Sequence, residues 1–384
     1  MSAIRTTVAD IDLDALDANV RALGSGGAQV IAVVKADAYG HGAEMVAESA
    51  LDAGAVMVAV FTVEEAVLLR RTLRDGPILV LGGVADEAEA EAAVASSLTV
   101  TVWDEHRARL LSAAGRAAGR SVSVHMKIDT GLTRLGVLPD QALERWNAIA
   151  AIPGLELDGV FTHFATADDV GDTFAAEQVR RFAAVVGTLP VRPRLIHASA
   201  SAGIAKLGLT PPCNTVRPGL ALYGLYTATH LLAPQLRPVL RWSSRIHRVV
   251  SVPAGTGVGY GHDYRTHRPG RIATVPVGYG DGLPRSARRA NVLVRGRVVP
   301  IANRVAMDLF MIDVTDVPDA REGDEVVLIG EQDGERLSAE DLAASCGTIN
   351  YEVVTNIRQR VPRRYFRGGE LVATRTMADG LVRA

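Results

Sequence analysis

The chain has 384 residues, of which 48% are hydrophobic, 22% charged and 5% aromatic. This apolar content supplies a buried core and excludes intrinsic disorder as the main character of the chain. At roughly 150 residues per domain, the length fits two or three domains, or one large barrel with a companion. The 41 Lys and Arg residues against 43 Asp and Glu residues leave a formal net charge of −2. No global basic field therefore attracts phosphate backbones, which makes nucleic acids and anionic membranes poor partners.

The cysteines and the amino terminus indicate a cytoplasmic protein. Cys213 and Cys346 are too few for a disulfide framework or a thiolate metal cage, and no apolar signal segment follows the first charges. The longest stretch without Asp, Glu, Lys or Arg spans residues 218–236, but it contains His230 and Pro234. Because a histidine is costly in hydrocarbon and a proline interrupts a helix, we reject a membrane span and expect a soluble protein.

Up to about residue 230, short β-branched runs alternate with longer alanine-rich amphipathic segments, which is typical of a parallel α/β fold. Eight candidate strands predict a closed (β/α)8 barrel of the TIM type. The alternative is a doubly wound sheet, but its phosphate fingerprint is missing after the first strand. The predicted strands span residues 29–34, 56–60, 78–81, 98–102, 122–128, 157–162, 195–198 and 220–223. The predicted helices include residues 43–53, 63–73, 104–118, 139–151 and 174–188.

The residue pattern of the sequence changes after the proline-bearing stretch 232–238. Short valine and isoleucine runs separated by glycine and proline now predict a mainly antiparallel β domain. We expect residues 10–232 to form the barrel, residues 233–384 the β domain, and residues 1–9 a strand that joins the β domain. The predicted strands of this domain include residues 245–252, 271–277, 290–294, 310–314 and 325–329.

The first segment that carries chemistry is Val-Val-Lys-Ala-Asp-Ala-Tyr-Gly-His-Gly at residues 33–42. A lysine at the carboxyl end of a barrel strand points to the end where active sites of this architecture are built. Apolar neighbours can lower a lysine pKa to roughly 7–8, which makes the amine a competent base or Schiff-base nucleophile. Position alone leaves a second interpretation open, in which Lys35 is a surface lysine that ends a buried run.

Lys35 and the residues after it resemble the pyridoxal-phosphate lysine motif of alanine racemases. The resemblance extends over nearly the whole chain and implies an isomerase that interconverts L- and D-alanine, uses pyridoxal 5′-phosphate and supplies D-alanine for peptidoglycan. It also implies a barrel followed by a β domain. The further matching stretches occur in the order of the family and span residues 127–136, 162–164, 197–201, 216–224, 258–261, 277–282, 307–308 and 347–352.

The resemblance implies two catalytic bases. In the family, the lysine that matches Lys35 holds the cofactor and acts as the base on one face of the substrate Cα. The tyrosine that matches Tyr260 is the base on the other face. Racemisation needs both faces, because one base that returns its proton to the same side gives no inversion. On the residues alone, Tyr260 is a tyrosine in a glycine-rich β turn.

Four positions match residues that bind the cofactor phosphate, namely Tyr39, Ser201, Gly219 and Tyr351. Hydroxyls and a backbone N–H beside a glycine form an uncharged cradle, and late βα loops of such barrels commonly hold phosphate. Arg217 matches the residue that faces the pyridine nitrogen. A guanidinium stays protonated at any working pH, so it donates to that nitrogen and keeps it unprotonated.

The remaining site residues also follow from the resemblance. His163 matches a histidine that supports the arginine. Arg134 matches a contact to the cofactor ring hydroxyl and the substrate carboxylate. Lys127 matches a lysine that is carbamylated in several members, where its negative charge would hold Arg134. Met307 and Asp308 match the β-domain segment that meets the substrate carboxylate. Taken singly, His163 would be a structural histidine and Arg134 a surface arginine, while Met307 and Asp308 are equally consistent with a turn after a strand.

One active site requires residues of both predicted domains, because Lys35 lies on the barrel while Tyr260, Met307 and Asp308 lie on the β domain. The family meets this requirement with a head-to-tail dimer, in which the β domain of one chain completes the barrel site of the other. We therefore expect an obligate C2 homodimer with two composite sites.

The chain departs from the family pattern around the site, which leaves phosphate binding and substrate preference open. The departures lie at residues 132–133, at Ala200 and at residues 303–309. Tyr351 favours a small substrate side chain, and a racemase of serine or another small amino acid is the alternative. No catalytic metal is expected, because His262 and His267 lack the spacing and companions of a zinc site.

Two other classes fit the residues less well. A non-catalytic cofactor-binding barrel would keep Lys35 but lack the β domain and the second base. A decarboxylase of related fold would need an acid in place of Arg217, together with an acidic segment around a cysteine near its end, where this chain has only Cys346.

Overall fold

The computed structural model describes residues 4–226 and 236–384. The chain divides into two compact units. The barrel unit comprises Ala15–Ala38 and Ala43–Arg237, and the β unit comprises Met1–Asp14, Tyr39–Gly42 and Pro238–Ala384. The expected boundary at residues 232–233 lies outside the described residues. Within the described residues, no helix combines the length and the apolar character that crossing a membrane requires.

The barrel unit contains a closed barrel of eight parallel strands, which confirms the predicted fold class. Each strand pairs with the next, and the pairing of Gln29 with Thr215 closes the ring. Seven of the predicted strands are correct to within two residues. The strands are β2 (Gln29–Val33), β3 (Met57–Val60), β4 (Ile78–Val80), β5 (Thr99–Val102), β6 (Val122–Lys127), β7 (Leu155–Phe161), β8 (Leu195–His197) and β9 (Thr215–Val216).

The prediction of the eighth strand is wrong. Leu220–Tyr223 forms a 3-10 helix, η2, and the strand that closes the barrel is Thr215–Val216. A short apolar run is compatible with a buried strand or a buried helical turn, and hydrophobicity does not distinguish them. Pro218 follows β9 and has no N–H for a sheet ladder, so the strand ends early. The Tyr223 hydroxyl donates to the Val33 carbonyl oxygen at 3.1 Å, which ties η2 to the end of β2.

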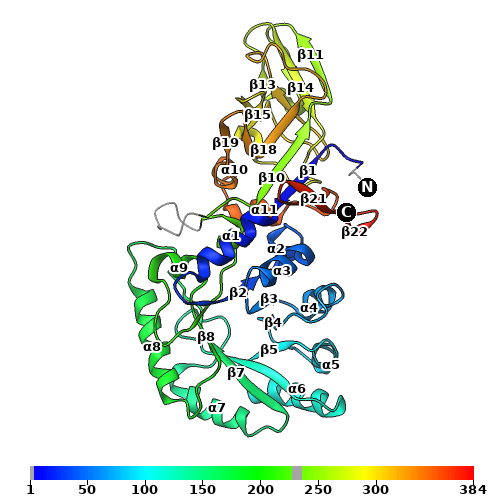
Figure 1. The fold of residues 1–384 in the computed structure, drawn as a ribbon. Helices are drawn as coiled ribbons and strands as arrows, with labels where there is room; N and C mark the ends of the chain where they lie inside the picture. Colours follow the sequence, from blue (N-terminus) through cyan, green and yellow to red (C-terminus); the bar gives the residue numbers. More distant parts are fainter. Residues whose placement is uncertain (1–3, 227–235) are drawn as a thin grey trace. The chain divides into compact units, whose positions relative to one another are not determined.

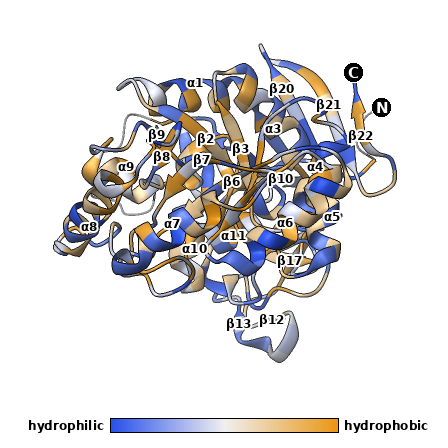
Figure 2. Cartoon of the chain, turned by 90° about the horizontal axis from the view of Figure 1, so that it is seen from below, coloured by the Kyte–Doolittle hydropathy of each residue, from blue (hydrophilic) through white to orange (hydrophobic). Residues whose placement is uncertain are grey.

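Helices surround the barrel strands (Figure 1). Figure 2 shows that the strands carry mainly the hydrophobic colour, as expected for strands that are buried on both faces. Three of the helices begin at side-chain caps, which satisfy backbone N–H groups of the first turn: Thr62 caps α4, Asp86 caps α5 and Asp104 caps α6. The helices are α1 (Leu13–Gly24), α3 (Ala43–Asp52), α4 (Val63–Arg70), α5 (Glu87–Ala95), α6 (Glu105–Ala117), α7 (Ala142–Ala150), α8 (Phe174–Thr188) and α9 (Ser201–Leu207).

A left-handed turn follows β2. The short helix α2 (Lys35–Tyr39) contains Ala36, Asp37 and Ala38 with φ of 51°, 56° and 54°, and Tyr39 continues with φ of 53°. A non-glycine residue in this region costs roughly 1–2 kcal/mol, because Cβ approaches the following carbonyl oxygen. Four such residues in a row therefore make the segment after β2 strained, and surrounding contacts must hold it.

The β unit contains a nine-stranded sheet, a three-stranded sheet and a two-stranded sheet. The main path of the large sheet runs β16-β15-β18-β10-β1-β20-β21-β22, and β19 pairs with β18. Its strands are β1 (Val8–Asp12), β10 (Leu240–Arg245), β15 (Asn291–Val294), β16 (Arg297–Pro300), β18 (Glu325–Gln332), β19 (Glu335–Leu337), β20 (Arg363–Arg367), β21 (Glu370–Thr376) and β22 (Gly380–Arg383). The smaller sheets contain β11 (Arg248–Val252), β14 (Gly270–Val275), β17 (Phe310–Asp313), β12 (Gly257–Val258) and β13 (Tyr264–Arg265).

The single strand predicted over residues 245–252 is wrong, because it is two strands in two sheets. β10 ends at Arg245 in the large sheet, and β11 begins at Arg248 in the three-stranded sheet. Between them, Ile246 donates to the Asp324 carbonyl oxygen and His247 to that of Thr274. The chain thus changes its hydrogen-bonding partner within two residues while its hydrophobic pattern continues.

Candidate active site

Four predicted site residues gather at the carboxyl ends of the barrel strands. Lys127 ends β6, while Lys35, His163 and Arg217 follow β2, β7 and β9 within two residues. Burial lowers the pKa of Lys35, and the charges of Arg134 and then Arg217 lower it further. The Lys35 amine forms no hydrogen bond or salt bridge within residues 4–226 and 236–384. The arrangement provides a lysine amine that loses its proton more readily than an exposed lysine.

Lys127 is a buried amine among cations, with 5% of its surface exposed. Burial, followed by the charges of Arg217 and Arg134, lowers its pKa to about 8. Its amine lies 5.6 Å from the centre of the Phe161 ring, and it pairs with no carboxylate in the described part of the chain. About a tenth of Lys127 is therefore uncharged at pH 7, and an uncharged amine is the form that reacts with carbon dioxide.

Arg217 is 3% exposed and its hydrogen bonds fix the protonation of two histidines. Its Nη1 lies 2.7 Å from His197 Nδ1, and its Nη2 lies 3.0 Å from His163 Nδ1. A guanidinium only donates, so both Nδ1 atoms accept and both rings carry their proton on Nε2. Burial, followed by the charge of Arg217, lowers the pKa of both histidines well below its usual range. Two neutral histidines thus hold one charged arginine.

The row of hydrogen-bonding groups continues beyond the predicted residues. His197 Nε2 lies 3.0 Å from His125 Nδ1, so His197 donates and His125 accepts. The Nε2 of His125 lies 3.7 Å from Asp158 Oδ2, an electrostatic contact longer than a hydrogen bond. Arg194 binds the same carboxylate through Nε at 2.8 Å and Nη2 at 2.6 Å. A row of hydrogen-bonded and ionic side chains therefore leads from buried Arg217 to the exposed side chain of Arg194.

The predicted site residues include neither His125 nor His197, although the stretch 197–201, which resembles the family, begins with His197. Both rings are fully buried inside the barrel. One signal was available for His197, because it stands in the otherwise apolar predicted strand 195–198, where a polar side chain needs a buried partner. A second signal is Gly159 on the neighbouring β7, where a Cβ would lie 2.6 Å from the His125 ring.

Ser201 and Gly219 form an uncharged cradle. The Ser201 hydroxyl accepts hydrogen bonds from the N–H groups of Gly219 at 3.1 Å and Ala221 at 3.0 Å. Both bonds use lone pairs of the hydroxyl oxygen, so its own proton is left to donate to an added acceptor. Ser201 is the first residue of α9 and is 8% exposed. The remaining hydroxyl proton suits an anionic oxygen such as that of a phosphate.

The other predicted residues belong to the β unit. The rings of Tyr39 and Tyr351 lie 6.2 Å apart, centre to centre, at 48°. Tyr260 begins the short helix η3 (Tyr260–His262) and is 69% exposed, and Met307 is 54% exposed. Asp308 Oδ1 accepts from Arg360 Nη2 at 2.7 Å. The predicted residues thus form two groups, one on each unit.

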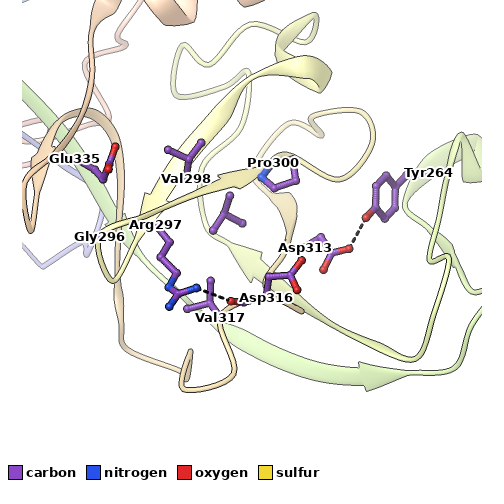
Figure 3. A pocket seen from close by; sticks show the side chains of 10 residues that line it. Tyr264, Gly296, Arg297, Val298, Pro300, Asp313, Asp316, Val317 and Glu335 are labelled. Carbon is purple, nitrogen blue, oxygen red and sulfur yellow. Dashed lines mark hydrogen bonds between the residues drawn. The ribbon is translucent and has the colours of Figure 1, made fainter.

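The β unit also has a cavity of about 520 Å³ that contains none of the predicted site residues (Figure 3). The hydroxyl of Tyr264 donates to Asp313, and Arg297 donates to the Asp316 carbonyl oxygen at 3.4 Å. Burial, followed by the hydrogen bond to Asp313, raises the pKa of Tyr264. In the described residues, no three His, Cys, Asp or Glu side chains group so that they could hold a metal ion. Two of the carboxylates that line the cavity have partners, since Asp313 binds Tyr264 and Asp316 binds Arg268.

Two family models match the chain. The model described as alanine racemase, N-terminal domain, matches residues 11–227, and the model described as alanine racemase, C-terminal domain, matches residues 239–365. Together they cover most of the sequence.

Relatives match the chain over nearly their full lengths. An alanine racemase from Symbiobacterium thermophilum is 43% identical over 379 residues, which cover 96% of this chain and 99% of the relative. The solved alanine racemase from the D-cycloserine producer Streptomyces lavendulae gives a TM-score of 0.89 at 37% identity, covering 96% of this chain and 98% of that one. The alanine racemase from Bacillus anthracis, solved with bound L-Ala-P, gives 0.89 at 34% identity, covering 99% and 100%.

Proposed function

The chain belongs to the alanine racemase family, a family of isomerases, and on that premise we propose that it interconverts L- and D-alanine with pyridoxal 5′-phosphate as cofactor. The observation that carries this proposal is the group formed by Lys35, Arg217 and the two neutral histidines, His163 and His197. It combines an amine of lowered pKa with a guanidinium that stays charged.

The residues of the barrel unit fit pyridoxal phosphate. The Ser201 hydroxyl keeps its proton for the phosphate, and the amine of Lys35 has no competing partner in the described part of the chain. Lys35 would hold the cofactor covalently, Arg217 would face the pyridine nitrogen, and Arg134 would face the ring hydroxyl. When bound, the cofactor supplies an electron sink for the charge that remains after the α-proton of the substrate leaves.

Arg217 has one electrostatic role in this proposal. Its Nη1 and Nη2 donate to His197 and His163, and burial keeps both histidines neutral. Because a guanidinium cannot lose its proton in a protein, Arg217 would present donors to the pyridine nitrogen and leave it unprotonated. In this role Arg217 would favour return of the proton to the substrate Cα over the side reactions that a protonated ring nitrogen permits.

Two bases would move the proton. The amine of Lys35, with its lowered pKa, would take or return the α-proton on one face of the substrate, and the hydroxyl of Tyr260 would do so on the other face. Inversion follows because the proton is taken from one face and a proton is delivered to the other. Met307, Asp308 and Arg134 would orient the substrate carboxylate.

A homodimer would bring the two groups of residues into one site. Tyr260 and Met307 are largely exposed on the β unit, although the proposed roles require both to meet a substrate. A partner chain that places its β unit over the barrel of this chain would remove the exposure and complete two equivalent sites. Within each chain, the barrel would bind the cofactor and the β unit would complete the partner's site. A fully active monomer in sedimentation experiments at assay concentration would contradict this part of the proposal.

Alanine is favoured over a larger substrate because Tyr39 and Tyr351 place two aromatic rings close together among the residues proposed to bind cofactor. A serine racemase, or a racemase of another small amino acid, is the alternative. The D-alanine produced would supply peptidoglycan synthesis in the cytoplasm.

The experiment that tests the substrate uses purified protein with added pyridoxal phosphate. L-Alanine and L-serine are offered separately, and optical rotation is followed over time. We expect loss of rotation with alanine and a much slower loss with serine. Equal or faster loss with serine would favour the alternative, and no loss with either would contradict a racemase of these amino acids.

A further inference from the structure

We propose that Glu65 is a positioning residue for Lys35, because its carboxylate holds the strained turn that begins directly after the lysine. This inference rests on the role proposed above for Lys35 and adds a residue that belongs to neither the predicted nor the described site. Glu65 lies in the first turn of α4, the helix that follows the neighbouring strand β3.

The carboxylate of Glu65 accepts three backbone hydrogen bonds. Its Oε1 accepts from the N–H of Ala36 at 2.6 Å. Its Oε2 accepts from the N–H groups of Phe61 at 2.8 Å and Thr62 at 3.1 Å, while Thr62 Oγ1 accepts from the N–H of Glu65. Hydrogen bonds to a carboxylate are about twice as strong as neutral ones. The hydrogen bonds to Phe61 and Thr62 therefore hold the side chain of Glu65 in one rotamer. In that rotamer its Oε1 holds the backbone N–H of Ala36, the residue after Lys35.

The position of this contact matters because Ala36 is the first residue of the left-handed turn. A turn with four consecutive non-glycine residues at positive φ persists only where contacts outweigh its strain. Further along the turn, Ala38 donates to the Val34 carbonyl oxygen, and Ala43 donates to Asp37 Oδ1, both at 2.9 Å. Glu65 is thus the contact that acts at the start of the turn, next to the Cα of Lys35.

The charge of Glu65 has a second effect on the same lysine. The positive charges of Arg134 and Arg217 lower the pKa of Lys35, and the charge of Lys35 in turn lowers the pKa values of Lys127 and His163. Among the charges that shift the pKa of Lys35, Glu65 is the anion, and it raises the pKa while burial and the arginines lower it. Removal of this charge alone should lower the pKa of Lys35 further.

The chain contains a matched control one helix further on. Glu89 occupies the same position of α5, where its Oε2 accepts from the N–H of Ala85 at 2.6 Å and its own N–H donates to Asp86 Oδ1 at 2.9 Å. The loop before α5 carries no lysine. Substitutions at Glu89 therefore remove an equivalent helix-capping interaction without touching the segment around Lys35.

The test compares Glu65→Gln, Glu65→Ala, Glu89→Gln and Glu89→Ala in the full chain. The cofactor-free protein is pulse-labelled with acetic anhydride across a pH series, and labelling of Lys35 is quantified by peptide mass spectrometry. Separately, pyridoxal phosphate is added for increasing times, trapped by borohydride reduction, and located in the same peptides. Neither readout depends on turnover.

We expect Glu65→Gln to move the labelling midpoint of Lys35 about one pH unit lower, because one nearby charge is lost. Glu65→Ala should show that shift and also slow the attachment of pyridoxal phosphate at least about tenfold, because the turn loses its first contact. Both Glu89 variants should match the wild type in both readouts. Glu65 variants that behave like the Glu89 variants would overturn the inference. Trapped cofactor on a lysine other than Lys35 in the wild type would instead overturn the proposed function.

Discussion

The Nη1 atom of Arg217 lies 2.7 Å from Nδ1 of His197, inside the barrel and out of contact with solvent. Because the guanidinium always donates, this contact assigns the proton of His197 to Nε2, and through it the proton of His125 to Nε2 as well. The tautomers of two buried histidines therefore follow from one arginine.

Replacement of His197 by phenylalanine should be strongly destabilising. The substitution keeps an aromatic ring in place but leaves Arg217 Nη1 and His125 Nδ1 without their partner. A buried polar group that loses its partner costs about 1–3 kcal/mol, and a charged one costs more. We expect the free energy of unfolding in urea to fall by about 3 kcal/mol, while His106→Phe on the exposed surface should change it by less than about 0.5 kcal/mol. Equal stability of the two variants would contradict the assigned row.

Lys127→Met should stabilise the cofactor-free chain at pH 7. The pKa of Lys127 is about 8 in the folded chain and about 10.4 when unfolded, so at neutral pH folding is opposed by the cost of burying the charge. The unfolded chain binds more protons between these values, and the stability of the wild type therefore rises as the pH rises through that window. We expect a gain of about 3 kcal/mol at pH 7 that has largely disappeared by about pH 10.5.

The measurement is urea unfolding in carbon-dioxide-free buffer at both pH values, with Arg116→Met on the exposed face of α6 as control. A gain that persists at high pH would mean that packing, and not charge, is responsible. In buffer with ¹³C-labelled bicarbonate, the uncharged amine should give a carbamate carbon signal in the wild type that is absent from Lys127→Met.

Ser201→Ala should weaken the binding of pyridoxal phosphate about tenfold, because the cradle loses a hydroxyl donor while the N–H groups of Gly219 and Ala221 lose their acceptor. The dissociation constant can be measured by titration of the cofactor absorbance. Ser199→Ala is the matched control, since Ser199 is also buried but its hydroxyl donates to the Gly208 carbonyl oxygen. A larger effect at Ser199 than at Ser201 would contradict the cradle.

Tyr351→Ala should relax discrimination between alanine and serine. The substitution removes one of two tilted rings whose centres lie 6.2 Å apart, and the added space admits a hydroxymethyl group. The ratio of kcat/KM for serine to that for alanine should rise at least about tenfold. Tyr351→Phe keeps the ring and should leave the ratio close to that of the wild type. An unchanged ratio in Tyr351→Ala would reject this account of substrate size.

The barrel could be predicted because seven of its strands are short runs rich in β-branched and other apolar residues, which alternate with good helix formers. The eighth could not be recognised in this way, since Thr215 and Val216 form a strand of only two residues and the more hydrophobic run at Leu220 forms a 3-10 helix. The left-handed turn after Lys35 could not be predicted from the sequence either. Ala36, Asp37 and Ala38 contain no glycine or asparagine, and their strain is imposed by contacts from other elements.

The candidate site was predictable where a residue stands next to the end of a strand, as Lys35 and Arg217 do. The row through His125 to Asp158 and Arg194 was not, because its members come from β6, β7 and the start of β8 and meet only when the barrel closes. Glu65 was missed for another reason. A glutamate in the first turn of a helix is expected to cap that helix, and nothing in the sequence shows that its other oxygen reaches Ala36.

The most direct test of the two-base account follows Tyr260→Phe with added pyridoxal phosphate in deuterated water. L-Alanine and D-alanine are supplied separately, and both the loss of the Cα proton signal and the optical rotation are recorded. The account predicts that the variant still attaches the cofactor through Lys35 and exchanges the α-proton of one enantiomer without inverting it. Inversion of either enantiomer at the rate of the wild type would contradict the assignment of Tyr260 as the second base.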